Sequence, residues 1–168
     1  MRLLFEIDKK DYDPDGEVFR RPSSRGIIFR GGRIAVIYSR RDRYCKLPGG
    51  GIEPGEDNVS AMIREVREET GLAVKPETVR EFGYVHRIQK GTHEPVFIQD
   101  NYYYFCEVGD VQKSTELTQD ETAADFVPMF MDIKDVIGIN EACLCRENNV
   151  MIERELRVLK MIAEELSG

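Results

Sequence analysis

The stretch 49–72, GGGIEPGEDNVSAMIREVREETGL, decides much of the fold, because it joins a run of glycines to a patterned helix. From Val59 to Val66, apolar residues recur at i, i+3, i+4 and i+7, which predicts an amphipathic helix over residues 57–70. Gly71 supplies the left-handed residue that commonly ends a helix. We therefore expect this helix to pack its apolar face on a sheet.

Three glutamates, Glu65, Glu68 and Glu69, cluster on one flank of that helix, roughly 115° from its apolar face. Like charges at this spacing destabilise a helix, and two of them lie near the end whose dipole disfavours anions. Arg64 offsets part of this repulsion, because it can pair with Glu68 four residues later. A solvated acidic face is one interpretation. A site for a divalent cation is the other, because Mg²⁺ prefers a few carboxylate oxygens with water and phosphate, and Mn²⁺ accepts the same ligands.

Three consecutive glycines, residues 49–51, precede the turn into the helix. Residues without a Cβ atom let the backbone approach a ligand or metal closely, so the carbonyl of Gly49 is a candidate further ligand. Turn formation alone accounts for Gly55 and Gly71.

The whole chain has the length and composition of a single globular domain, which we expect over residues 1–168. No apolar run approaches the roughly 20 residues that span a membrane, and the first residues turn acidic too soon for a secretory signal. We therefore expect a cytoplasmic protein without membrane association. The net charge of −7 argues against a nucleic-acid polymer as the ligand. Small phosphate compounds stay possible, since a metal on the carboxylates can hold them.

Strand patterns lie on both sides of the predicted helix. Residues 25–30 and 33–40 flank a Gly-Gly pair and indicate a β-hairpin. Strands are also expected over 79–88 and 97–108, and aromatic side chains alternate onto both faces of the second, which predicts a strand covered on two sides. A further strand is expected over 125–133, at a sheet edge or a bulge because it contains a proline.

The C-terminal part is expected to form a helix from about residue 147. Its apolar stripe predicts a face docked in the core: Ile152, Leu156, Leu159, Ala163 and Leu166. Residues 111–124 are polar and are expected to form a loop, and residues 1–21 an N-terminal extension with a strand packed on the domain. This element order predicts an α/β fold with a mixed β-sheet.

The stretch around the helix resembles the signature of the Nudix hydrolase family, G-x5-E-x7-R-E-U-x-E-E-x-G-U, where U is a bulky aliphatic residue. The chain supplies every fixed position: Gly50, Glu56, Arg64, Glu65, Val66, Glu68, Glu69, Gly71 and Leu72. Nine specified positions over 23 residues make the match specific. The resemblance implies the family's α/β/α sandwich over roughly residues 22–165.

The resemblance also implies the chemistry. It points to Mg²⁺-dependent attack of water on the diphosphate linkage of a nucleoside diphosphate derivative or a nucleoside triphosphate. By the matching positions, Glu65, Glu68, Glu69 and the Gly49 carbonyl would bind the metal, and Arg64 would orient the carboxylates.

The general base varies in the family. It is either a glutamate of the signature, here Glu65, or an acidic residue on a loop before the last sheet strand, where Asp120 and Glu121 lie. Glu121 is the preferred candidate of the two loop residues. Glu56 would belong to the turn and the helix start. Homodimers are common in the family, so a homodimer stays open.

Substrate choice depends on residues outside the signature. Arg40, Arg41 and Arg43 precede the glycines, and their planar guanidinium groups match phosphate oxygens, so they are candidate substrate-binding residues. Residues 85–91 contain neither the proline of ADP-ribose hydrolases nor the tyrosine of dinucleoside polyphosphate hydrolases. The expected partner is therefore a small nucleotide-type diphosphate of unspecified kind. The alternative is a catalytically silent module that binds a nucleotide, and the intact glutamates favour the hydrolase.

Overall fold

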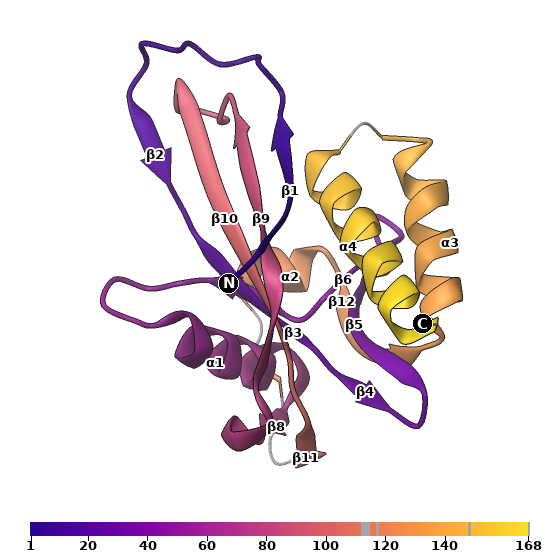
Figure 1. The fold of residues 1–168 in the computed structure, drawn as a ribbon. Helices are drawn as coiled ribbons and strands as arrows, with labels where there is room; N and C mark the ends of the chain where they lie inside the picture. The colour runs from indigo at the N-terminus through magenta and orange to yellow at the C-terminus, as the bar shows by residue number, and fades with distance from the viewer. Residues whose placement is uncertain (112–114, 117, 148, 168) are drawn as a thin grey trace.

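The chain folds around a mixed six-stranded sheet (Figure 1). A computed structural model describes residues 1–111, 115–116, 118–147 and 149–167. The strands of this sheet are β1 (Leu3–Asp8), β2 (Val18–Arg20), β3 (Ser23–Ile27), β7 (Gly49–Gly51), β9 (Arg80–Gln89) and β10 (Val96–Phe105). Their order is β1-β9-β10-β3-β7, and β2 also pairs with β10. Because β10 runs antiparallel to β9 and parallel to β3, the sheet is mixed, as predicted.

Two smaller sheets complete the strands. One has β12, β5 and β4 in that order with β6 beside β5, and the other pairs β11 with β8. Their bounds are β4 (Phe29–Arg30), β5 (Arg33–Ser39), β6 (Tyr44–Lys46), β8 (Leu72–Val74), β11 (Val108–Val111) and β12 (Phe126–Met131). Gly31 and Gly32, both with positive φ, join β4 to β5, which confirms the predicted hairpin. Pro128 lies in β12 at a sheet edge, where a missing N–H donor is tolerated.

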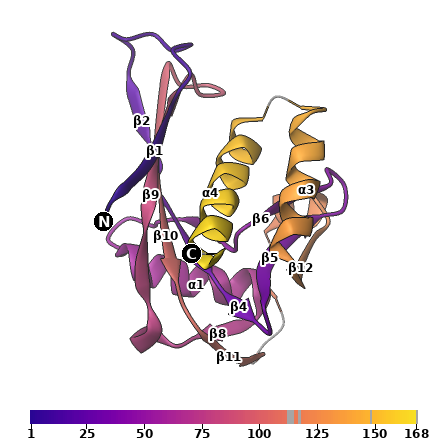
Figure 2. The same cartoon turned by 45° about the vertical axis from the view of Figure 1, so that its right-hand side comes forward.

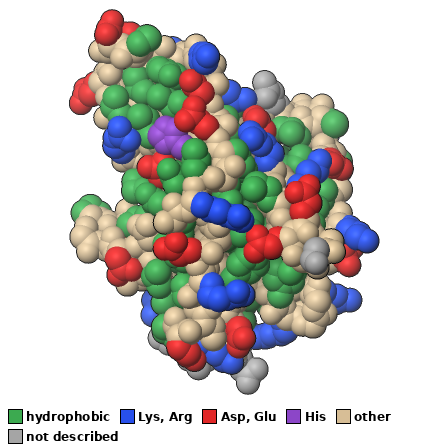
Figure 3. Space-filling model, in the orientation of Figure 1, with side chains coloured by type: hydrophobic (Ala, Val, Ile, Leu, Met, Phe, Trp, Pro, Cys, Tyr) green, Lys and Arg blue, Asp and Glu red, His purple; other side chains and the backbone are tan. Residues whose placement is uncertain are grey.

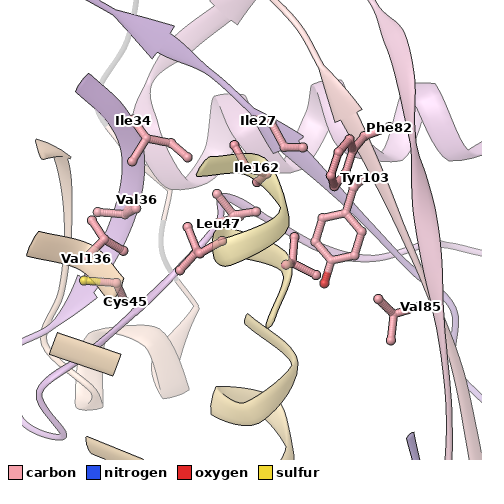
Figure 4. Packing of buried hydrophobic residues seen from close by; sticks show 12 residues of the cluster. Ile27, Ile34, Val36, Cys45, Leu47, Phe82, Val85, Tyr103, Val136 and Ile162 are labelled. Atoms are coloured by element: carbon pink, nitrogen blue, oxygen red, sulfur yellow. The ribbon is translucent and has the colours of Figure 1, made fainter. Parts of the chain in front are cut away.

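Helices cover both faces of the sheet (Figures 1 and 2). They are α1 (Asn58–Thr70), α2 (Gln119–Ala123), α3 (Ile133–Leu144) and α4 (Val150–Ser167), with a 3-10 turn at Pro76–Thr78. On one face of β10, Tyr104 packs in a cluster with Met62 and Val66 of α1. On the other face, Tyr103 packs in a cluster with Leu159 of α4 and Val136 of α3 (Figure 4). This arrangement confirms the predicted α/β/α sandwich and the two-sided burial of β10.

Helix α1 begins and ends where the sequence predicts, because both of its ends are capped. The Asp57 side chain accepts hydrogen bonds from the backbone N–H groups of Val59 and Ser60, each at 3.0 Å. At the other end, Gly71 has a φ of 71° and its N–H donates to the carbonyl of Arg67. These caps set the two ends of α1, the helix that carries the three glutamates.

The structure corrects three expectations. Part of the predicted loop 111–124 is helix α2, which a capping box at Thr118 starts; residues 112–114 and 117 lie outside the described part. Helix α3 was not foreseen, because Asp132 caps a new helix where the strand pattern seemed to continue to residue 133. Leu166 is 56% exposed and therefore leaves the predicted core stripe of α4, whereas two charged residues of that helix are buried.

Within the described ranges, no helix combines the length and the apolar character needed to cross a membrane.

Two leucines of the α4 stripe, Leu159 and Leu166, give a direct test of this packing. Leu159 is fully buried, so Leu159→Ala should lower the free energy of unfolding by about 2–5 kcal/mol, because it leaves a cavity. Leu166→Ala, the matched control, should change it by less than about 0.5 kcal/mol. Urea denaturation of both variants measures the difference. Equal losses would mean that α4 docks in another orientation.

Candidate active site

A cavity of ≈ 530 Å³ opens where β7, α1 and α2 meet. Its acidic lining includes all three glutamates of the α1 flank together with Glu121 of α2. Its basic lining includes Arg64 and Lys46. Figure 3 shows acidic and basic side chains mixed across the middle of the face seen in Figure 1. The structure therefore brings the predicted carboxylates together around one space.

The glycines of β7 are required by close packing on both sides of the strand. At Gly49, where φ is 142°, a Cβ atom would lie 2.2 Å from the carbonyl oxygen of Ser24 in β3. At Gly50, a Cβ atom would lie 2.5 Å from Oε2 of Glu65 in α1. At Gly49 the clash is with backbone, so no residue with a Cβ atom fits, whereas at Gly50 a side chain would displace the Glu65 carboxylate. The glycine run therefore seats the backbone directly against the Glu65 carboxylate.

Arg64 holds the carboxylates of α1 in place. Its guanidinium donates to Glu56 at 2.9 and 3.0 Å, to Glu65 at 2.8 Å and to Glu68 at 3.2 Å. It also donates to the carbonyl of Gly51 at 3.0 Å. The hydrogen bonds to Glu56 raise the pKa of Arg64 further above its usual range, so its charge is permanent. This geometry fits the predicted orienting role, which remains a prediction.

Glu69 is the most deeply buried of the three glutamates, with 1% of its surface exposed. One oxygen accepts from Nζ of Lys46 at 2.7 Å and the other from the N–H of Gly49 at 2.8 Å. Burial raises the pKa of Glu69 to about 7, although the Lys46 charge acts in the opposite direction. Lys46 also lies 3.9 Å from the Glu121 carboxylate and over the ring of Phe126. Lys46 is thus the local counter-charge of this corner of the cavity.

Glu121 lies on α2, not on a loop as the sequence suggested. The N–H and the hydroxyl of Thr118 both donate to its Oε2 at 2.8 Å. Burial acts to raise the pKa of Glu121, but these hydrogen bonds prevail and lower it. For Glu65, in contrast, burial prevails over Arg64 and raises the pKa. The two candidate bases are therefore tuned in opposite directions.

The donor set fits a hard divalent cation. Carboxylate oxygens of α1 and α2 share the cavity with the backbone of Gly49, and oxygen ligands are what Mg²⁺ prefers. Among the residues that the structure describes, no three acidic, histidine or cysteine side chains are already gathered as a set of ligands. Instead, Arg64 and Lys46 neutralise the glutamates. A bound metal would compete with these two cations.

The structure does not bring the three predicted arginines into the cavity. Arg41 donates to Asp42 and to the carbonyl of Ala123, and Arg40 lies 3.9 Å from an exposed carboxylate, that of Asp125. Arg43 is likewise absent from the lining. Their role in binding substrate stays a prediction.

Besides Arg64, two arginines that the sequence did not single out line the cavity, Arg21 and Arg25. The pairing of β3 with β7 places Arg25 there, and the hydrogen bond from Ile52 to the carbonyl of Pro22 continues this contact beside Arg21. No sequence pattern in their segment points to this pairing.

Buried charges support the glycine strand from the α4 side. Nη1 of Arg25 donates to the carbonyls of Leu47 and Gly49, at 2.8 and 3.1 Å. Glu155 of α4 accepts from the N–H of Leu47 at 2.9 Å and from Nη2 of Arg154 at 2.7 Å. Burial opposes ionisation of Glu155, but the charges of Arg25 and Arg154 prevail and lower its pKa. The segment leading into β7 is therefore tied to the C-terminal helix.

Comparisons with known proteins agree with this geometry. The family model described as NUDIX domain matches residues 20–152. The chain is 31% identical over 101 residues to nucleoside triphosphatase NudI of Enterobacter sp. (strain 638), covering 57% of this chain and 68% of that protein. It is 30% identical over 101 residues to the asymmetrical bis(5'-nucleosyl)-tetraphosphatase of Mus musculus, covering 57% and 56%.

The fold also matches solved structures. A NUDIX hydrolase from Nitrosomonas europaea superposes with a TM-score of 0.58 at 17% identity, covering 83% of this chain and 87% of the other. This likeness concerns the fold alone. The chain spans about half the length of several curated relatives that it matches.

Removal of the buried Glu155 carboxylate tests its support of the glycine strand. Glu155→Ala leaves two buried arginines without their counter-charge, so the free energy of unfolding should fall by about 3–5 kcal/mol. Glu164→Ala, an exposed glutamate on the same helix, is the control and should be nearly neutral. Chemical denaturation followed by circular dichroism measures both. A small effect of Glu155→Ala would show that the ion pairs of Glu155 with Arg25 and Arg154 are not needed for stability.

The raised pKa of Glu69 predicts a pH dependence of stability. A buried carboxyl that titrates at about 7 binds its proton more tightly in the folded than in the unfolded chain, where it titrates near 4.5. The free energy of unfolding of the wild-type protein should therefore fall by on the order of 2–3 kcal/mol, relative to that of Glu69→Gln, as the pH rises from about 4.5 to about 7. Denaturation at several pH values, with Glu164→Gln as control, measures this. A difference that stays constant with pH would contradict it.

Proposed function

Since this chain belongs to the NUDIX domain family, we propose that it is a divalent-metal-dependent hydrolase of a small nucleotide-type compound. The bond cleaved is a diphosphate linkage, and water is the attacking group. The observation that carries the proposal is the convergence of four glutamates from two helices on one cavity beside a glycine strand. Relatives named as a nucleoside triphosphatase and a tetraphosphatase support the substrate class.

Glu65, Glu68, Glu69 and the Gly49 carbonyl are the groups that would hold Mg²⁺ or Mn²⁺ in this proposal. When bound, the metal supplies positive charge for diphosphate oxygens and makes water more acidic. Arg64 keeps Glu65 and Glu68 in fixed orientations, which reduces the rearrangement needed when the metal arrives.

Two carboxylates are candidates for the general base. Glu121 is ionised and oriented by Thr118, but its lowered pKa makes it the weaker proton acceptor. Glu65 has a raised pKa and is therefore the stronger acceptor. Both carboxylates are therefore retained as alternative bases: Glu65 is the more basic without a metal but is also a proposed metal ligand, whereas Glu121 has no such role and is oriented by Thr118.

A silent nucleotide-binding module is the second candidate. The pairing of Lys46 with Glu69 favours it, because a lysine already neutralises a carboxylate that the metal would use. The complete signature argues for the hydrolase.

Turnover measurements separate the two candidates. Wild-type protein with Mg²⁺ should hydrolyse at least one member of a panel of nucleoside triphosphates, nucleotide sugars, ADP-ribose and dinucleoside polyphosphates. Glu68→Gln should lower kcat by about 100-fold or more, because it removes charge from the metal site. Glu164→Gln on the exposed face of α4 is the control and should retain full activity. Tight binding of one compound without any turnover in the panel would favour the silent module.

A further inference from the structure

The glycine strand separates two walls of unlike charge. Gly50 faces Glu65 of α1, whereas the Cβ position of Gly51 lies 3.7 Å from Nε of Arg21. Successive strand positions face opposite sides, so the carboxylates and Arg21 flank the strand on its two sides. Arg25 lies on the same side as Arg21, because a Cβ atom at Gly49, two positions before Gly51, would lie 2.8 Å from Cγ of Arg25. We call Arg21 and Arg25 the basic wall.

Arg21 offers a free guanidinium on a fixed backbone. Its N–H donates to the carbonyl of Ile98 at 3.1 Å, and the next carbonyl, that of Pro22, accepts from Ile52 at 3.1 Å. Its side chain is exposed and, within the described part of the chain, has no ion-pair or hydrogen-bond partner. An arginine that lines a cavity without a partner is available to an incoming anion.

Arg25 has donors left over although it is buried, with 7% of its surface exposed. Nη1 serves the carbonyls of Leu47 and Gly49, but Nε has no hydrogen-bond partner. Its counter-charge, Glu155, lies 3.6 Å away and is shared with Arg154. A buried cation with a shared counter-ion gains more from a further anion than a solvated one does.

Positive charge exceeds negative charge behind this wall. Arg87 of β9 pairs in register with Gln99, which lines the cavity, and its Nε also has no hydrogen-bond partner. Burial, together with the positive charges of Arg154 and Arg25, lowers the pKa of Arg87 to about 10. Arg25 and Arg154 therefore share the carboxylate of Glu155, and Arg87 adds a third positive charge close to them.

We propose that the basic wall binds a phosphate group of the substrate, separate from the phosphate oxygens that the carboxylate side holds through a metal. This inference rests on the proposed function for the identity of the substrate. The arginine fork matches phosphate oxygens, and the Gln99 amide adds a neutral donor. No aromatic ring lines the cavity in the described residues, so the group beside this wall is polar and not a stacked base.

Binding of methylene diphosphonate, an analogue of diphosphate that cannot be hydrolysed, tests the basic wall. Calorimetric titration in the presence of Mg²⁺ should give an affinity for Arg21→Ala that is roughly tenfold weaker than for the wild type. Arg20→Ala is the matched control, because Arg20 is the exposed neighbour outside the cavity. It should bind within about twofold of the wild type.

The outcomes also separate this inference from the proposed function. Equal affinities of wild type, Arg20→Ala and Arg21→Ala, or no binding to the wild type, would overturn the proposal that the basic wall binds phosphate. If Arg21→Ala weakens binding but no compound of the panel is hydrolysed, phosphate binding by the basic wall is supported and the proposed hydrolase activity is contradicted. If a substrate is found, Arg21→Ala should raise its KM roughly tenfold with little change in kcat, and an unchanged KM would overturn the inference while leaving the hydrolase intact.

Discussion

Close approach of the β7 backbone to its neighbours is the constraint on which the site depends. On one side, Gly49 packs on β3 with no room for a Cβ atom, and on the other, Gly50 packs on the Glu65 carboxylate. Arg25 and Glu155 fix the segment before the strand through its backbone groups. Because both faces are in contact, the position of α1 relative to the sheet determines where its carboxylates lie. The packing that forms the fold therefore also determines the geometry of the acidic cavity.

The acidic flank of α1 is tolerated because cations of the chain neutralise it. Arg64 pairs with Glu56, Glu65 and Glu68, and Lys46 pairs with Glu69. A divalent ion has to compete with these pairs, so their free energy is subtracted from the affinity for the metal. The same pairs keep the carboxylates oriented before any ion arrives. Affinity is thus reduced in exchange for a prearranged set of ligands.

Sequence patterns predicted the elements whose cause is local. Helix α1 has a capping aspartate, an apolar period and a terminal glycine within one stretch, and the Gly31-Gly32 hairpin is equally local. The acidic half of the cavity followed from the same stretch. The basic wall did not, because Arg25 reaches the cavity through the pairing of β3 with β7 and Arg21 lies two residues before β3. Helix α3 was not predicted, because its apolar residues continue the pattern of the strand before it. Only the Asp132 cap separates the two elements.

The buried charges of α4 show why an apolar stripe describes that helix only in part. Arg154 and Glu155 are almost fully buried, and isolated charges there would be strongly unfavourable. They are accepted because each finds partners on other elements: Asn101 of β10 for Arg154, and Leu47 before β7 for Glu155. Apolar packing alone would let α4 slide or turn with little penalty, whereas these directional bonds allow one docked position. Docking of the C-terminal helix and assembly of the glycine strand are therefore coupled, so a change that loosens α4 also loosens the floor of the cavity.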